Sequence, residues 1–286
     1  MNNLGARSAM TKRRFLLSIL LLAAALGFGG PPALAENPFI IVASTTSTQD
    51  SGLYGYLLPL FSQRSGIEVR VVAKGTGEAI KLAEHGDADV LFVHDQKSEE
   101  AFVAAGYGVK RYPVMYNDFI IVGPKSDPAG IGGMHDAVAA LRKIVDDKNI
   151  FVSRGDDSGT NKAELRLWKE AGINVKPLSG VWYYETGSGM GPTLNTAADM
   201  GAYTLTDRAT WAAFKNKRSL VPLVEGDPRL LNQYGVTLVN PARFPHVKAH
   251  DGQAFIDWLI SPEGQRAIAG YRIDGQQMFY PNAGGA

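Results

Sequence analysis

Hydrophobic residues in this chain form two kinds of pattern, short unbroken runs and positions spaced three or four apart. Short apolar runs between polar residues are typical of buried strands, and the wider spacing is typical of helices. From position 38 to 93 the patterns predict strands at 39–43, 67–72 and 89–93, with helices near 52–65 and 78–85 between them. Strands that alternate with helices indicate a parallel sheet covered by helices.

A second series of strands and helices follows a strand predicted at 118–123. It comprises strands at 149–152, 181–184 and 202–206, and helices near 134–146, 162–171, 190–199 and around Trp211 and Phe214. An extended segment at 234–239 and helices at about 249–260 and 262–270 complete the chain. Because two extended segments flank the second series, we expect an α/β protein of two lobes with a ligand cleft between them. The expected bounds are 36–122 and 236–286 for lobe I, and 123–235 for lobe II.

Individual side chains extend these predictions. The helix near 52–65 has an apolar stripe, and Pro59 inside it predicts a kink or a break. Ser261 and Pro262 suit the N-cap and first turn of the last helix. Residues expected in the core are Leu53, Tyr56, Leu57, Leu60 and Phe61 of that stripe, and Leu165, Trp168, Trp211 and Trp258 elsewhere.

Residues 1–35 have the features of a secretory signal peptide. Basic residues come first, an apolar run of 14 positions follows at 15–28, and Ala33-Leu34-Ala35 resembles a cleavage site. The run is shorter than the roughly 20 residues of a membrane-spanning helix. We therefore expect cleavage near Ala35 and a periplasmic protein. Arg13-Arg14 leaves the export route open between the general and twin-arginine pathways.

The composition narrows the class further. The chain has no cysteine, which excludes a disulfide framework, a thiol nucleophile and a lipoprotein anchor. The signal peptide holds four of the 29 basic residues and no acidic residue, so the mature chain has a net charge of −3. A mildly acidic chain without a basic stripe is not typical of nucleic-acid binding. We expect a monomer without a cofactor.

The segment from Ser153 to Asn161 has the chemistry of an anion site. It reads Ser-Arg-Gly-Asp-Asp-Ser-Gly-Thr-Asn and connects a predicted strand to a predicted helix. The free amides and the positive dipole end of a helix N-terminus favour an anion. Ser158 and Thr160 offer hydroxyl donors, and Arg154 adds a planar, fixed charge. A simpler interpretation remains, in which Ser158 or Thr160 caps the helix and Arg154 pairs with Asp156 or Asp157.

Two further loops have a similar character. Ser44-Thr45-Thr46-Ser47-Thr48 follows the strand at 39–43 and precedes a helix, which suggests that two distant segments converge on one oxyanion. Lys74-Gly75-Thr76-Gly77 follows the next strand, and its glycines allow a close approach of the backbone to a ligand. The alternative for this loop is an ordinary turn.

Other classes of protein fit less well. Gly187-Ser188-Gly189-Met190-Gly191 and Asp157-Ser158-Gly159 do not form the Gly-x-Ser-x-Gly elbow of a serine hydrolase, so we do not expect an enzyme. His246 and His250 lack a third ligand nearby, so we expect no directly bound metal cation.

Together these segments resemble the periplasmic tungstate-binding proteins of ABC importers. The resemblance covers nearly all of the mature chain, and its most specific motif is the Arg154 loop. It implies the type II periplasmic-binding fold, with one tetrahedral oxyanion bound between two lobes. It also implies a permease and an ATPase as membrane partners. The ligand-binding residues that the resemblance or the loop positions suggest are Thr45, Thr46, Ser47, Thr76, Arg154, Ser158, Gly159, Thr160 and Ser188.

The identity of the oxyanion stays open at this point. Tungstate, molybdate and sulfate are dianions near neutral pH and need donors only, whereas hydrogen phosphate also needs an acceptor for its proton. If Asp156 or Asp157 faced the ligand, phosphate would be favoured. Tungstate and molybdate are too similar in size for these residues to separate. A sensor that presents its ligand state to a membrane receptor is a further alternative.

Overall fold

Three parallel strands begin the fold. They are β1 (Phe39–Thr45), β2 (Glu68–Lys74) and β3 (Val90–Val93), and β1 lies between the other two. The structure is a computed structural model that describes residues 38–284. The predicted signal peptide at 1–35 lies outside the described residues.

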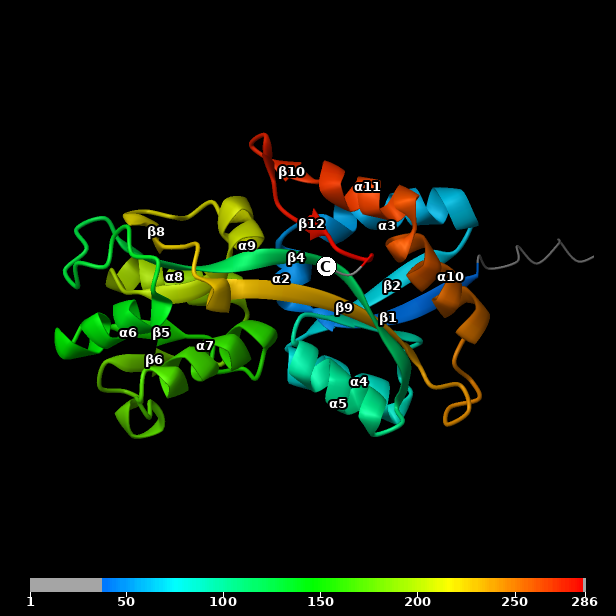
Figure 1. Cartoon of the computed structure of the whole chain (residues 1–286), viewed down its shortest axis with the longest axis horizontal. Helices are drawn as coiled ribbons and strands as arrows, with labels where there is room; N and C mark the ends of the chain where they lie inside the picture. Colours follow the sequence, from blue (N-terminus) through cyan, green and yellow to red (C-terminus); the bar gives the residue numbers. More distant parts are fainter. Residues whose placement is uncertain (1–37, 285–286) are drawn as a thin grey trace, which may run out of the picture. The chain divides into compact units, whose positions relative to one another are not determined.

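Two long strands extend this sheet and continue beyond it. The first, β4 (Gly108–Pro124), pairs antiparallel with the second, β9 (Leu231–Val239), which itself pairs antiparallel with β3. The far end of β4 pairs with β7 (Thr204–Asp207) and β8 (Leu220–Val224). The strand order is therefore β12-β4-β9-β3-β1-β2, with β7 and β8 joined through β4. Figure 1 shows β4 and β9 running side by side from one group of helices to the other.

Helices cover both faces of the first group of strands, which we term lobe I. A buried cluster that includes Leu57, Phe61 and Phe255 lies under α3, α10 and α11, and a second cluster around Ala79 and Phe102 lies under α4 and α5. The helices of lobe I are α2 (Thr46–Asp50), α3 (Leu53–Ser65), α4 (Thr76–His85), α5 (Gln96–Ala104), α10 (Ala249–Ile260) and α11 (Pro262–Gly270).

The second group, lobe II, has its own buried clusters. One surrounds Trp168 and Phe151, and the other surrounds Met190 and Leu194. Its remaining elements are the parallel strands β5 (Phe151–Ser153) and β6 (Tyr183–Glu185), the helices α6 (Ala137–Asp146), α7 (Gly159–Glu170), α8 (Met190–Met200) and α9 (Arg208–Ala213), and the short turns η1 (Lys176–Leu178) and η2 (Pro228–Leu230). Three short strands, β10 (Arg272–Ile273), β11 (Gln276–Gln277) and β12 (Tyr280–Pro281), complete the described chain.

The helix with the central proline differs from its prediction. α3 continues through Pro59 without a break, and a separate helix, α2, precedes it. Tyr56 and Leu60 of the predicted stripe are exposed, whereas Tyr54 is buried. The apolar stripe on α3 is therefore narrower than the sequence spacing indicates.

Other elements were predicted with mixed success. Leu165 of α7 is exposed and its neighbour Leu167 is buried instead. Trp168, Trp211 and Trp258 are buried as predicted, and Ser261 caps α11 by accepting the amide hydrogen of Gly264. Three elements, α5, β8 and the first half of β4, were not predicted from the sequence. Among the described residues, no helix is long and apolar enough to cross a membrane.

Candidate oxyanion site

The loop between β5 and α7 is held in shape by its own side chains. Ser158 is the N-cap of α7 and accepts a hydrogen bond from the amide of Asn161. Asp156 accepts one from the amide of Ser158, at 3.3 Å. Gly155 and Asp157 have positive φ angles of 60° and 56°, which a glycine and an aspartate tolerate better than most residues. The loop thus connects Arg154 to the N-terminus of a twelve-residue helix whose N-cap is Ser158.

The Arg154 side chain leaves lobe II and contacts the first two residues of α2, which follows β1 directly. Its Nη1 donates to Ser47 Oγ at 2.6 Å, and its Nη2 donates to Thr46 Oγ1 at 3.0 Å. The guanidinium is 1 % exposed and also pairs with Asp156 Oδ2 at 2.6 Å. The salt bridge of the simpler interpretation is therefore present, but it is buried and forms together with the contacts between the lobes.

The hydroxyl groups after β1 differ in their availability. Ser47 and Thr46 each accept a hydrogen bond from Arg154, which leaves their own hydrogen free for another acceptor. Thr45 caps α2 and bonds Thr48 Oγ1 at 2.7 Å. Ser44 donates to the carbonyl of Phe92 and contacts the hydroxyl of Tyr54. The hydroxyls of Ser44 and Thr45 thus serve lobe I itself.

The Lys74–Gly77 loop packs tightly against lobe II. The amide of Gly77 donates to the carbonyl of Asp157 at 3.2 Å. A methyl group built on Gly75 would lie 2.8 Å from the carbonyl oxygen of Asp156, and one built on Gly77 would lie 1.8 Å from Asp157 Oδ2. These glycines are needed because the two loops approach each other so closely.

Four buried polar atoms in this region have no hydrogen-bond partner. They are Thr76 Oγ1, Thr160 Oγ1, Arg154 Nε and His94 Nε2. A methyl group built on Gly159 would lie 3.1 Å from Thr76 Oγ1 and 2.7 Å from ring carbon Cε1 of His94, so three of these residues meet at the start of α7. Leaving a buried donor unpaired costs about 1–3 kcal/mol, so the unpaired donors of Thr76, Thr160 and Arg154 indicate a missing acceptor.

His94 is the first residue after β3 and was not predicted to belong to the site. Its Nδ1 lies 3.0 Å from Asn232 Oδ1, and the amide group of Asn232 donates to Asn117, which donates to Asp207. This chain assigns the proton to Nδ1 and leaves Nε2 as an acceptor. Burial, with a smaller contribution from the Arg154 charge, lowers the pKa of His94 to about 4. His94 is therefore neutral near pH 7. Ligands bind at the carboxyl ends of parallel strands, so the position of His94 directly after a predicted strand was the sequence signal that could have identified it.

The two aspartates of the Arg154 loop already have partners. Asp156 binds Arg154 and the Ser158 amide. Asp157 pairs with Lys162 at 2.8 Å, and its side chain is 63 % exposed. Both carboxylates thus have a cationic partner.

Ser188 lies near the site but its hydroxyl is engaged. It donates to the carbonyl of Thr186 at 3.2 Å, and its amide donates to the carbonyl of Arg154 at 3.3 Å. A methyl group on Gly189 would lie 3.8 Å from Thr46 Oγ1, so the turn before α8 flanks the contact between the loops. Ser188 therefore supports the backbone at Arg154, and its hydroxyl is not directed to the cluster of unpaired atoms.

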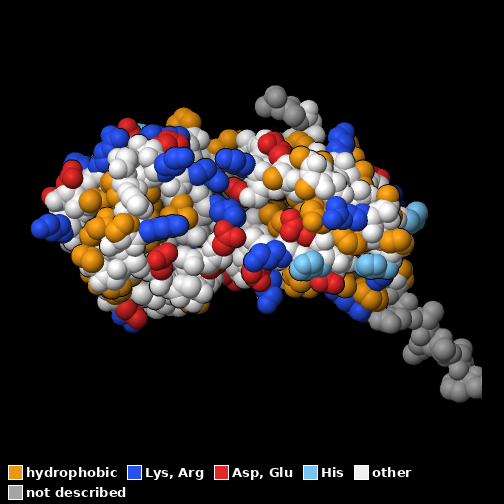
Figure 2. Space-filling model, turned by 90° about the horizontal axis from the view of Figure 1, so that it is seen from below, with side chains coloured by type: hydrophobic (Ala, Val, Ile, Leu, Met, Phe, Trp, Pro, Cys, Tyr) orange, Lys and Arg blue, Asp and Glu red, His pale blue; other side chains and the backbone are white. Residues whose placement is uncertain are grey.

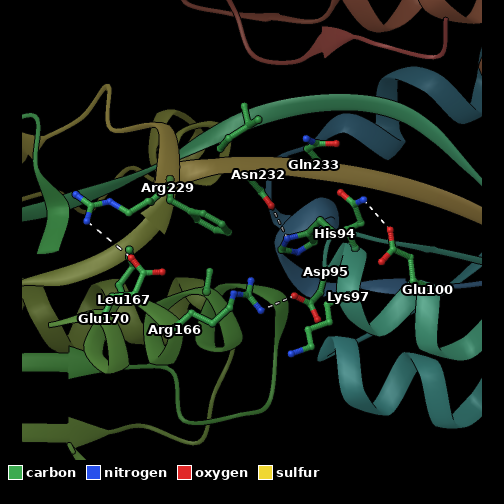
Figure 3. Close-up of a pocket in the computed structure, with 14 residues that line it drawn as sticks. His94, Asp95, Lys97, Glu100, Arg166, Leu167, Glu170, Arg229, Asn232 and Gln233 are labelled. Carbon is green, nitrogen blue, oxygen red and sulfur yellow. Dashed lines mark hydrogen bonds and ion pairs between the residues drawn. The ribbon is translucent and has the colours of Figure 1, made fainter. Parts of the chain in front are cut away.

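A cavity of about 410 Å³ lies next to His94, beneath β4 and β9. Figure 3 shows Arg166 of α7 reaching across it to Asp95, and the two form an ion pair at 2.7 Å. Basic and acidic side chains are interspersed over the face of the molecule that Figure 2 shows. Arg154 does not line this cavity but His94 does, so the cavity adjoins the candidate oxyanion site.

The two histidines with a spacing suited to a metal have other partners. His246 Nε2 bonds the carbonyl of Gly86 at 2.8 Å, and His250 contacts Asp251 at the surface. Within residues 38–284 no group of three His, Cys, Asp or Glu side chains is arranged to hold a metal ion.

Two α/β lobes that share crossing strands and meet at buried hydrogen-bond donors define the class of solute-binding proteins. The chain belongs to the PBP superfamily, because the model of that superfamily's domain matches residues 30–263.

Several relatives and solved structures are similar over most of the chain. The tungstate-binding protein TupA of Peptoclostridium acidaminophilum is 48% identical over 248 residues, which are 85% of this chain and 86% of the relative. The structure of the tungstate ABC transporter protein from Geobacter sulfurreducens is 50% identical, with a TM-score of 0.75 over 82% of this chain and 98% of the other. TupA from Desulfovibrio alaskensis is 47% identical, with a TM-score of 0.73 over 86% of this chain and 99% of the other. These matches confirm the predicted family and fold.

Proposed function

We propose that this chain is the substrate-binding component of an ABC importer and captures tungstate between its two lobes. The observation that carries the proposal is the contact of Arg154 with Ser47 and Thr46, beside the unpaired donors of Thr76 and Thr160. Relatives of similar length that are named for tungstate binding support the choice of ligand.

The chemistry of the donors suits a dianion. Ser47, Thr46, Thr76 and Thr160 contribute hydroxyls, and the amides of Gly159 and Thr160 lie at the positive end of α7. Arg154 Nε adds a charged donor. Each hydrogen bond to a charged group contributes about 1.5–3 kcal/mol, so five or six such bonds are enough for tight binding.

Capture then couples ligand binding to the association of the lobes. An oxyanion that accepts hydrogen bonds from both lobes stabilises the state in which the lobes meet. In the same proposal, lobe I consists of 36–122 and 236–286, and lobe II of 123–235. Separate hydrophobic clusters on the two sides of β4 and β9 support this division.

The remaining parts of the proposal concern the cell. A cleaved signal peptide ending near Ala35 would deliver the protein to the periplasm, where it would bind as a monomer without a cofactor. A permease and an ATPase at the membrane would then receive the oxyanion. We propose binding and no catalysis, because the relatives are named for binding. Molybdate is an equivalent ligand on the grounds of size and charge.

Hydrogen phosphate is a second candidate, and one observation favours it. The unpaired Nε2 of His94 is an acceptor and suits the proton of hydrogen phosphate. Asp156 and Asp157, by contrast, are engaged with other groups.

A thermal-shift titration of the mature protein with tungstate, molybdate, sulfate, phosphate and chloride separates these candidates. A ligand at about 100 times its Kd stabilises by about 2.7 kcal/mol, which raises Tm by about 5–11 °C for a protein of this size. A large shift with micromolar tungstate and little with phosphate supports the proposal. A shift with phosphate alone transfers the assignment to phosphate, and no shift with any anion overturns the binding function.

A further inference from the structure

Glu164 lies behind the Arg154 loop, in the core of lobe II. It is on α7, four residues after Thr160, and is 2 % exposed. Its carboxylate accepts hydrogen bonds from Ser153 Oγ at 2.7 Å, Tyr183 Oη at 2.7 Å and Trp168 Nε1 at 2.9 Å. Three donors of three different elements thus converge on one buried carboxylate.

Ser153 links this carboxylate to the loop. Its hydroxyl accepts the amide of Gly155 and the side-chain amide of Asn161, both at 3.2 Å. Asn161 in turn accepts the amide of Asp157 at 3.3 Å. Because the single hydrogen of Ser153 Oγ is directed to Glu164, its lone pairs are left to hold the loop.

The carboxyl of Glu164 has no cationic partner among the described residues. Its three donors are neutral, and the charge of the acidic Glu185 of β6 disfavours ionisation of Glu164. Arg154, next to Ser153, points away toward Ser47. Burial raises the pKa of Glu164 to about 7, with Glu185 adding to the effect, while the pKa of the adjoining Tyr183 lies far above its usual value.

We propose that Glu164 is a positioning residue for the Arg154 loop, and that the loop binds an oxyanion with uptake of a proton from solvent by the Glu164 carboxyl. The inference rests on the proposed function, since it concerns the same site. A dianion at the start of α7 and an ionised carboxylate behind the loop repel each other in a region of low dielectric. Protonation of Glu164 removes this repulsion, and a neutral carboxyl still accepts hydrogen bonds.

The chain contains a matched control for this glutamate. Glu99 of α5 is 1 % exposed, and burial raises its pKa to about 7 as well. It pairs with Arg111 at 2.6 Å and accepts the amide of Asp95, and it contacts no residue of the Arg154 loop. His94, with a pKa of about 4, stays neutral over the range in which both glutamates titrate.

The test is calorimetric titration of the mature protein with sodium tungstate near pH 7.5, in two buffers of different ionisation enthalpy. The wild type is expected to take up a sizeable fraction of one proton, with affinity that falls by up to about tenfold per pH unit as pH rises. Glu164→Gln is expected to bind tungstate without proton uptake and with affinity independent of pH. Glu99→Gln is expected to keep the uptake.

Two results would overturn the inference alone, namely tungstate binding by the wild type without proton uptake, or unchanged uptake in Glu164→Gln. If the wild type does not bind tungstate, the proposed function fails together with this inference. If circular dichroism shows that Glu164→Gln does not fold, the glutamate carboxyl carbons of the wild type can be followed by NMR. One raised carboxyl pKa must then rise further when tungstate is added, and an unchanged pKa overturns the inference.

Discussion

The junction of β1 with α2 and the loop after β5 both place several hydroxyls at the start of a helix, yet the structure uses them differently. In the first segment, Ser44 and Thr45 bond within lobe I, and Thr46 and Ser47 reach lobe II. In the second, a hydrogen-bond network fixes the backbone and presents one arginine and a full helix N-terminus. Two segments of similar composition therefore have different roles. Thr46 and Ser47, which we term the hydroxyl platform, supply hydroxyls, and the loop after β5 supplies a preorganised charge on Arg154.

Removing the charge of the second loop is expected to have the largest effect. Arg154→Ala leaves Ser47 and Thr46 without their donor and removes the cation that joins the two segments. We expect tungstate affinity to fall by about a hundredfold or more, which corresponds to several kcal/mol, with the fold intact. Calorimetric titration measures the affinity, and circular dichroism measures whether the fold is intact. Parental affinity in the variant would contradict the division of roles.

The role of the hydroxyl platform can be tested by substitutions at the junction of β1 and α2. Ser47→Ala removes a hydroxyl that faces Arg154, and we expect a loss of about 1.5–3 kcal/mol in binding. Thr45→Ala is the matched control, because it removes a helix cap and is expected to lower stability by about 1 kcal/mol with little change in affinity. Calorimetric titration of both variants with tungstate compares their affinities. An equal loss of affinity in the two variants would contradict the different roles of the two hydroxyls.

The close approach of the lobes provides a third test. Gly75→Ala places a methyl group 2.8 Å from the carbonyl oxygen of Asp156, and the φ of Gly75 is −63°, which alanine adopts without strain. The substitution therefore disturbs the contact between the lobes and not lobe I itself. We expect binding to weaken by about 1–3 kcal/mol with unchanged stability of the ligand-free protein. The control is Gly55→Ala, because a methyl group there meets no atom within 4 Å. Gly66→Ala also meets no atom, but the positive φ of Gly66 would strain an alanine. If Gly75→Ala binds as tightly as Gly55→Ala, the contact is not required.

The buried carboxyl behind the second loop predicts how stability depends on pH. The pKa of Glu164 is raised from 4.5 to about 7. A raised carboxyl pKa contributes stability that is complete below the unfolded value and is lost as pH rises through the folded value. We expect Tm of the ligand-free protein to fall between about pH 5 and 8, and the fall to be smaller in Glu164→Gln. An identical pH profile for the two proteins would contradict the raised pKa.

Ser188 is expected to give the smallest effect. Its hydroxyl donates to Thr186 and is not among the unpaired donors. We expect Ser188→Ala to bind tungstate within about twofold of the wild type, since a partly exposed neutral hydrogen bond contributes about 0.5–1.5 kcal/mol at most to the fold. A loss comparable to that of Ser47→Ala would add Ser188 to the site.

Much of this architecture was predictable from local sequence. The periodicity of apolar residues predicted the alternating elements, and the Arg154 loop was recognisable because hydroxyls, glycine and arginine precede a helix. Pro59 shows the limit of such rules, because packing of α3 on lobe I overrides the break that an isolated helix would favour. β4 was predicted only in its apolar half, since Lys110, Arg111 and Pro113 interrupt the apolar run in its first half.

The site was less predictable where it depends on tertiary contacts. Only the fold brings His94 beside Gly159, and only the fold shows that Thr45 and Ser44 are engaged within lobe I. Glu164 carries no sequence signal, because its role arises from its burial against Ser153, Trp168 and Tyr183. Composition identifies the donors that are present, and hydrogen-bond partners decide which of them remain available.

The central claim is that one oxyanion is held between the start of α2 and the loop after β5. A crystal structure of the mature protein with tungstate, with tungsten located by its anomalous scattering, tests it most directly. The account predicts one tungsten site whose oxygens accept hydrogen bonds from Ser47, Arg154 and Thr160. Tungsten bound elsewhere, for example in the cavity lined by Arg166 and Asp95, would contradict the account.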